Sequence, residues 1–210
     1  DFHPQAEEGY IRLTTHNAMA NRYNTQELKR LESRSHTYLA DVEGDFPEST
    51  YPTDDRLELK VGAQVMFVRN DPSPEHLYYN GRIGHVVYLD DERVQVLCPG
   101  GDKEIDVEPA QWENTKYKIN TKTKSIDAVV EGVFRQLPLR LAWAITIHKS
   151  QGLTFEHAII DAEMSFAPGQ VYVALSRCKT LEGLVLASRI DDKAIINDHE
   201  PVGQEPQGHA

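Results

Sequence analysis

The stretch "RLAWAITIHKSQGLTF", Arg140 to Phe155, changes abruptly from apolar to polar residues. Leu141–Ile147 is apolar enough to be buried, whereas the five residues that follow can bind anions or form hydrogen bonds. Ligands of open α/β sheets bind where the carboxyl ends of the strands meet. The stretch therefore predicts a buried strand or helix whose polar turn lies at that edge of a sheet.

The flanking segments have the strand and helix rhythm of an α/β protein. "EHAIIDA" (156–162) and "LEGLVLAS" (181–188) are typical of buried strands, and "PGQVYVALSRCKT" (168–180) predicts a helix that begins near Pro168. Near the N-terminus, residues 10–13 predict a strand and residues 18–31 a helix, with helix N-cap candidates at 14–17 between them. The fold class is therefore α/β with a parallel sheet.

The middle of the chain has a different pattern. Residues 41–56 are rich in proline and acids, which predicts an irregular connection, and short strands are expected at 57–61 and 65–68. Three turn signals, Asn80-Gly81, Asp90-Asp91 and Gly100-Gly101, then separate β-branched runs at intervals of about ten residues. These signals predict a small antiparallel barrel inserted between the two halves of the parallel sheet.

Composition excludes several classes of protein. The 210 residues are 40% hydrophobic and 26% charged. The sequence contains no run of about 18 apolar residues, the length needed to span a membrane. The cysteines, Cys98 and Cys178, form no CxxC pair, which suits a reducing cytosol, bacterial by expectation. The nine histidines lack zinc-binding spacing, so we expect no metal site. The start at Asp1, without Met, suggests a fragment.

The net charge of -11 gives no support for a nucleic-acid partner but does not exclude one. Acidic residues concentrate in the ends and the middle, whereas residues 137–190 contain five basic and four acidic residues. Alternate positions of one predicted strand contain lysine, so they share a face. That face would be either a solvated edge or a DNA-facing stripe, made of Lys116, Lys118, Lys122 and Lys124.

Two polar clusters are candidate phosphate sites. The first follows the apolar run and contains Thr146, His148, Lys149 and Ser150, with Gly152 allowing close approach to the backbone. The second is Arg177, which lies on an otherwise apolar helix face and suits a bidentate phosphate contact. Each has an ordinary alternative: Arg177 would pair with Asp161 or Glu163, His148 would cap a carbonyl, and residues 14–17 would only cap a helix.

Two long stretches, "LRLAWAITIHKSQGLTF" and "GQVYVALSRCKTLEGLVL", resemble motifs V and VI of superfamily 1B DNA helicases. The nearest resemblance is to the PIF family, which is related to RecD and Dda. Supporting segments are "LTTHNAMANRYN" and "LKVGAQVMFVRND…YYNGRIGHV", so the resemblance covers most of residues 10–190 in the family's order. The joint match is far more specific than any one of these motifs.

The resemblance implies a RecA-like motor domain called 2A, formed by residues 10–70 and 137–190. An SH3-like β-barrel called 2B would be inserted at residues 71–136, with flexible ends at 1–9 and 191–210. The pattern of the residues independently predicts a parallel sheet with an antiparallel insertion, so the pattern and the resemblance imply the same architecture.

The resemblance also implies residue roles. Arg177 would be the catalytic arginine that reaches the γ-phosphate of ATP, with Gln151 and Gly152 on the nucleotide side of the same cleft. Asn24 matches the family's second asparagine, or it only ties its helix to neighbouring segments. His16 replaces an expected small polar residue. The backbone of single-stranded DNA would be contacted by Thr15, His16, Asn17, Thr146, His148, Lys149 and Ser150.

The sequence contains no GxxxxGK[ST] phosphate-binding loop and no preceding Walker B acid pair. We therefore expect this chain to be the C-terminal motor half of a 5′-to-3′ ATP-dependent DNA helicase and to be inactive alone. Its partners would be single-stranded DNA and an upstream RecA-like domain of the same polypeptide, and the intact protein would use ATP and Mg²⁺. The alternatives are a non-catalytic nucleic-acid or protein binding module, or a RecD-like subunit of a nuclease complex.

Overall fold

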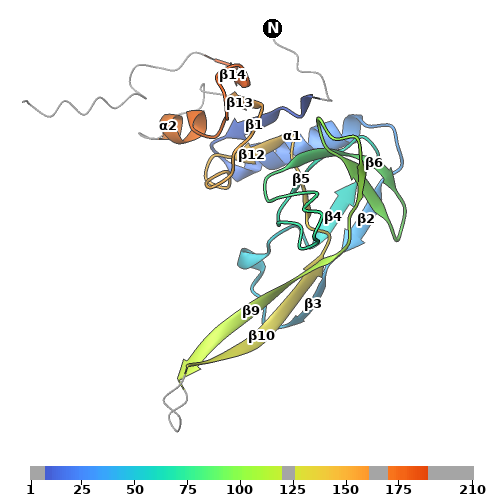
Figure 1. Cartoon of the computed structure of the whole chain (residues 1–210), viewed down its shortest axis with the longest axis vertical. Helices are drawn as coiled ribbons and strands as arrows, with labels where there is room; N and C mark the ends of the chain where they lie inside the picture. The colour runs from blue at the N-terminus through green and yellow to red at the C-terminus, as the bar shows by residue number, and fades with distance from the viewer. Residues whose placement is uncertain (1–7, 120–125, 161–169, 189–210) are drawn as a thin grey trace, which may run out of the picture.

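The computed structural model describes residues 8–119, 126–160 and 170–188 (Figure 1). A parallel sheet lies at one end of the molecule, and antiparallel sheets form the rest. Several expectations fall outside the described residues. They are the flexible ends at 1–7 and 191–210, the alternative partners Asp161 and Glu163, the helix start near Pro168, and the positions Lys122 and Lys124.

The parallel sheet has four strands in the order β12-β1-β13-β14, and every neighbouring pair is parallel. One strand comes from near the N-terminus and inserts between strands from the C-terminal third. The strands are β1 (Ile11–Thr14), β12 (Ala144–Thr146), β13 (Ala158–Ile160) and β14 (Leu184–Leu186). This confirms the predicted parallel sheet and its assembly from two distant segments.

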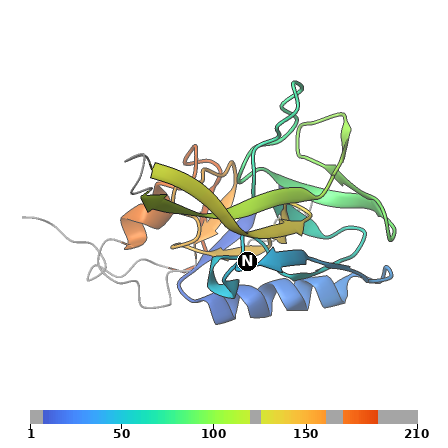
Figure 2. The ribbon, with the colours of Figure 1, turned by 90° about the horizontal axis from the view of Figure 1, so that it is seen from below.

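Two helices pack with this sheet. Helix α1 (Asn17–Arg30) follows β1 and lies along one face, and the short helix α2 (Gln170–Leu175) precedes β14 (Figures 1 and 2). The core beneath them is formed by fully buried strand residues such as Leu13 and Ile160, with Ala174 from α2. All three residues of β12 and of β13 are buried, which explains why these two strands lie in apolar runs of the sequence.

The antiparallel part contains a five-stranded sheet in the order β11-β5-β6-β7-β8. Its strands are β5 (Gln64–Phe67), β6 (Ile83–Leu89), β7 (Val94–Leu97), β8 (Glu104–Asp106) and β11 (Leu139–Leu141). A separate two-stranded sheet pairs β2 (His36–Leu39) with β4 (Arg56–Leu59). Strands β11 and β8 lie at opposite ends of the five-stranded sheet. The SH3-like barrel stays a prediction.

A long ribbon extends away from the body of the molecule (Figure 1). It pairs β9 (Ala110–Ile119) with β10 (Ile126–Gln136), and β3 (Asp41–Gly44) lies on the other side of β10. The expectation that residues 41–56 are irregular was wrong in part, because this segment contains β3 and the 3-10 helix η2 (Glu48–Thr50). All four β3 residues are exposed, so no hydrophobic pattern marks the strand.

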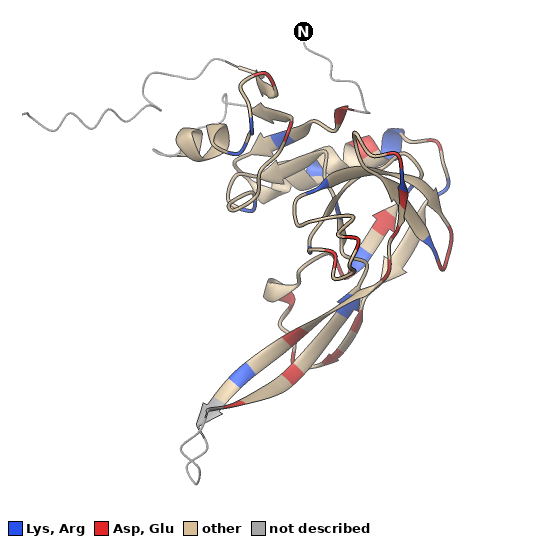
Figure 3. Ribbon diagram, viewed as in Figure 1, with Lys and Arg blue, Asp and Glu red and all other residues tan. Residues whose placement is uncertain are grey.

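The described part of this ribbon has both acidic and basic positions (Figure 3). The Lys116 ammonium pairs with the carboxylate of Glu131 and lies 3.7 Å from that of Asp45. These ion pairs raise the pKa of Lys116, the contact with Glu131 contributing most. Lys116 therefore interacts within the ribbon, which favours the solvated-edge interpretation at this position.

Sheet pairing crosses the boundaries predicted for the inserted module. Strands β5 and β11 lie outside residues 71–136 and still pair within the five-stranded sheet. The division into 2A and 2B stays a prediction. In the described part of the chain, no helix is both long and apolar enough to cross a membrane.

Candidate functional site

The first predicted cluster forms at the carboxyl edge of the parallel sheet. Strands β1 and β12 are parallel neighbours, and Thr14 lies opposite Thr146 in their register. The residues that follow each strand therefore emerge side by side at this edge. Thr15, His16 and Asn17 follow β1, and the Thr15 hydroxyl lies 2.7 Å from His16 Nδ1.

Only some of the predicted DNA contacts are exposed. His16, Asn17, His148 and Lys149 are exposed and Thr15 is half-buried. Thr146 is 3% exposed, and its hydroxyl accepts a hydrogen bond from the Lys149 backbone amide at 3.2 Å. Ser150 is fully buried and donates to the Ile147 carbonyl at 2.7 Å. In this conformation Thr146 and Ser150 shape the turn instead of facing solvent.

A cavity of about 320 Å³ lies beside this edge, between α1 and β12. A second cavity of about 520 Å³ adjoins it and shares Asp54, Arg140 and Lys149, so a continuous groove crosses the edge. Burial lowers the pKa of Lys149, nearby Arg140 lowers it further, and Asp54 opposes the change. The carboxylates of Glu48 and Asp55 line only the second cavity, whereas the first has two cations and one carboxylate, Asp54. The first cavity is therefore the candidate anion site.

The lining residues of this groove that were not predicted include Asn21, Thr25 and Arg140. A signal for the first two was present, because positions 17, 21 and 25 recur every four residues and share one helix face with polar side chains. Arg140 is a cation at the start of an apolar run, but only the folded chain brings it beside Lys149.

Asn24 joins α1 to the start of β12. Its side chain accepts a hydrogen bond from the Ala144 amide at 2.8 Å and donates to the Ala144 carbonyl at 2.9 Å. A weaker bond reaches the Leu141 carbonyl at 3.4 Å. The residue is 8% exposed. This geometry supports the simpler of its two sequence interpretations, in which it ties the helix to a neighbouring segment.

Arg177 lies at the opposite, amino edge of the sheet. Arg177 falls between α2 and the start of β14, and the bridge between Phe155 and Cys178 places it beside the segment that leads into the amino end of β13. Its guanidinium donates to the carbonyls of Val173 at 3.0 Å and Leu153 at 3.2 Å, and to the Ser176 hydroxyl at 2.9 Å. Its backbone carbonyl accepts from the Phe155 amide at 2.7 Å. Arg177 is thus fixed against the segment that follows Gly152.

The turn at Gln151 and Gly152 is exposed, and Gly152 has a positive φ of 80° with open space where a side chain would be. The structure brings this turn, which was expected on the nucleotide side, close to Arg177 through Leu153. It corrects the expectation that the polar turn, Gly152 included, lies wholly at the carboxyl edge. The chain from β12 to β13 must return to the amino edge, so the turn is divided between the two.

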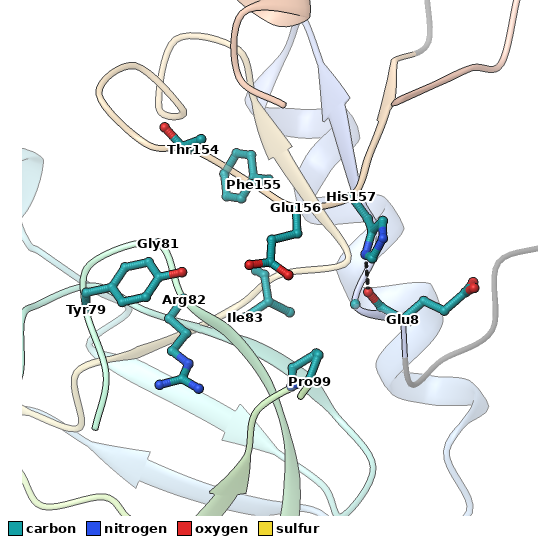
Figure 4. Close-up of a pocket in the computed structure, with 11 residues that line it drawn as sticks. Glu8, Tyr79, Gly81, Arg82, Ile83, Pro99, Thr154, Phe155, Glu156 and His157 are labelled. Carbon is teal, nitrogen blue, oxygen red and sulfur yellow. Dashed lines mark hydrogen bonds between the residues drawn. The ribbon is translucent and has the colours of Figure 1, made fainter. Parts of the chain in front are cut away.

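A further cavity of about 300 Å³ lies behind this segment, between residues 154–157 and the β5–β6 connection (Figure 4). Glu156 lines it and pairs with Lys179 at 2.9 Å, two residues after Arg177. This bond to Lys179 is the largest cause of the lowered pKa of Glu156. His157 Nδ1 lies 2.8 Å from the Glu8 carbonyl oxygen. These contacts help to fix residues 155–157, which pack beside Arg177.

The described residues contain no group of three or more His, Cys, Asp or Glu side chains placed to bind a metal ion.

Comparison with known proteins adds the family context. Residues 141–185 match the family model of the UvrD-like helicase C-terminal domain. The ATP-dependent DNA helicase Pif1 of Psychrobacter sp. (strain PRwf-1) is 34% identical over 236 residues, which cover 90% of this chain and 36% of that protein. The chain thus spans about a third of this relative.

Solved structures of Pif1 helicases are also similar to this chain. Unliganded Pif1 from Bacteroides sp. superposes with a TM-score of 0.82 at 42% identity, over 90% of this chain and 43% of that one. Bacteroides Pif1 in complex with ADP-AlF3 and single-stranded DNA gives 0.72 at 41% identity, over 94% and 44%. These similarities support the RecA-like helicase fold.

Proposed function

Because this chain is homologous over most of its length to the C-terminal part of Pif1-type helicases, we propose that it is the C-terminal motor half of an ATP-dependent 5′-to-3′ DNA helicase. It binds single-stranded DNA at the carboxyl edge of its parallel sheet and supplies Arg177 to ATP at the amino edge. The ATP lies in a cleft with an upstream RecA-like domain of the same polypeptide.

The DNA part of the proposal is supported by the groove at the carboxyl edge. Lys149 and Arg140 supply positive charge to phosphates, and Asn17, Asn21 and Thr25 supply hydrogen-bonding groups from one face of α1. Such contacts grip a backbone without reading its sequence. One of the solved Bacteroides Pif1 structures contains single-stranded DNA, which is consistent with this assignment.

The observation that carries the nucleotide part is the contact between Arg177 and the Leu153 carbonyl, directly after Gly152. It joins the two segments that the helicase resemblance assigns to the nucleotide, although they are 24 residues apart. The hydrogen bonds of the guanidinium to described residues all go to neutral groups, so its positive charge is available to a phosphate. The residues fit the phosphate end of ATP, whose Mg²⁺ would be bound by the upstream domain.

The test is single-strand-stimulated ATP hydrolysis by the whole protein, with Arg177→Ala and Arg177→Lys as variants. We expect Arg177→Ala to lower kcat by a factor of about 10³ or more, as for other arginine fingers. Arg177→Lys should recover little, because an ammonium group lacks the planar fork. Lys103→Ala is the matched control, since it removes an exposed cation that lines neither proposed site. Full activity of Arg177→Ala would contradict the proposal.

A further inference from the structure

A second groove lies in the antiparallel part of the molecule. It encloses about 940 Å³ between the β5–β6 connection and the segment that runs from β8 into β9. We call it the acidic groove, and its defining residues are Arg69, Asp71, Tyr78, Asp106, Glu108, Trp112 and Glu113.

Two edge strands border the acidic groove. Strand β8 is the last strand of the five-stranded sheet, and β9 is the last strand of the β3-β10-β9 sheet. An edge strand leaves one row of backbone amides and carbonyls without a ladder partner. Arg69 donates to the Gln111 carbonyl of β9 at 2.9 Å, so the β9 backbone faces the groove at this point.

Two aromatic side chains give the groove a firm, partly apolar lining. Tyr78 stacks on buried Phe67, with ring centroids 4.1 Å apart and planes at 13°. Trp112 packs edge-on against buried Phe134 at 6.0 Å, and the Arg69 guanidinium lies 5.8 Å from the Trp112 ring. Both Tyr78 and Trp112 remain partly exposed. Their positions are set before any ligand arrives.

The charge of the groove is negative, with four carboxylates and one guanidinium. Asp71 already accepts hydrogen bonds from the amides of Ser73 at 2.8 Å and Leu77 at 2.7 Å. Asp106 is paired with Arg93 at 2.6 Å. The remaining two, Glu108 and Glu113, are exposed, and no cation pairs with either in the described part of the chain.

We propose that the acidic groove binds an extended, basic peptide segment of a partner protein. An added strand would hydrogen-bond to a free sheet edge, and its alternate side chains would face the groove. Lysine or arginine side chains would meet Glu108 and Glu113, while apolar ones would pack on Tyr78 and Trp112. A phosphate backbone is disfavoured, because the same carboxylates repel it.

Trp112 supplies a specific readout for this interaction. The chain has two tryptophans, so Trp143→Phe leaves Trp112 as the only one. The probes are two nine-residue peptides, one alternating lysine with valine and one alternating glutamate with valine, together with a 15-nucleotide oligothymidylate. We expect only the lysine peptide to change Trp112 fluorescence in a saturable way, and the affinity should weaken as salt is raised.

Charge reversal tests whether the groove itself is responsible. Glu108→Lys combined with Glu113→Lys should weaken lysine-peptide binding by about tenfold or more, because two attractive carboxylates become repulsive ammonium groups. The matched control reverses two exposed acids elsewhere, Glu32→Lys with Glu182→Lys, and should bind as the original does. Circular dichroism checks that each variant is folded.

Several results would overturn the proposal. They are no saturable signal at millimolar peptide, equal binding of the glutamate peptide, and an unchanged affinity after reversal of Glu108 and Glu113. A Trp112 response to the oligothymidylate that competes with the peptide would make this groove a nucleic-acid contact instead. None of these results bears on Arg177 or on ATP hydrolysis, so the proposed motor function is tested separately.

Discussion

At the level of single residues, Asn24 connects the helix and the strand that form the carboxyl-edge groove. Replacing it with alanine leaves the Ala144 amide, which lies in the core, without its acceptor. An unsatisfied buried amide costs about 1–3 kcal/mol. We expect Asn24→Ala to lower the free energy of unfolding by about that amount, measured by urea denaturation, and to weaken binding of single-stranded DNA because β12 shifts.

The control for this prediction is Gln26→Ala, on the same helix, exposed to solvent and outside the groove. It should leave stability unchanged or slightly higher, since alanine is the better helix former. Asn24→Asp is a more stringent variant. It keeps an acceptor for Ala144 but turns a second oxygen toward the Ala144 and Leu141 carbonyls, so it should be at least as destabilising as alanine. Wild-type stability of both Asn24 variants would contradict the structural role.

At the level of elements, the attachment of β3 to β10 depends on Gly132. A Cβ at this position would lie 2.3 Å from the Asp45 carbonyl oxygen, next to the irregularity between Val130 and Gly132 in the β9–β10 pairing. Gly132→Ala should therefore displace β3 and destabilise the chain by about 1–3 kcal/mol. Hydrogen exchange should accelerate selectively in β3 and β10. Val129→Ala, on the same strand and partly exposed, should change exchange little.

The same element shows where sequence-based prediction reached its limit. Strand β1 and helix α1 were predicted within one or two residues, because an apolar run and a helical period are local signals. Strand β3 was missed because its residues are all exposed and its partner lies about 90 residues away. A local pattern does not indicate such a pairing.

In the candidate site, too, local signals were predicted and long-range placement was not. The polar residues themselves were identified from their positions after buried strands and from a family resemblance. Their division between two edges was not, because it depends on how the connection from Thr146 to Ala158 crosses the sheet. Arg140 was missed for a related reason, since only the antiparallel pairing of β11 with β5 places it in the groove.

At the scale of the whole molecule, the parallel sheet separates the proposed DNA and nucleotide functions. Thr14 and Thr146 end strands at the carboxyl edge, whereas Arg177 contacts the segment that leads into the amino end of β13. The short connection at residues 147–157 links the two edges. Movement at one edge would therefore reach the other through this connection rather than through shared side chains.

This separation predicts a double dissociation in the whole protein. Without nucleotide, Lys149→Ala should weaken oligothymidylate binding severalfold and reduce the salt slope of the affinity by about 0.7, the value for one phosphate contact on a single strand. Arg177→Ala should leave both unchanged. In ATP hydrolysis the two variants should differ in the opposite way. Lys149→Ala should raise the DNA concentration needed for half-maximal activity and keep kcat at saturating DNA. Arg177→Ala should lose kcat. Equal losses in both assays from either variant would show that the two edges do not act as separate sites.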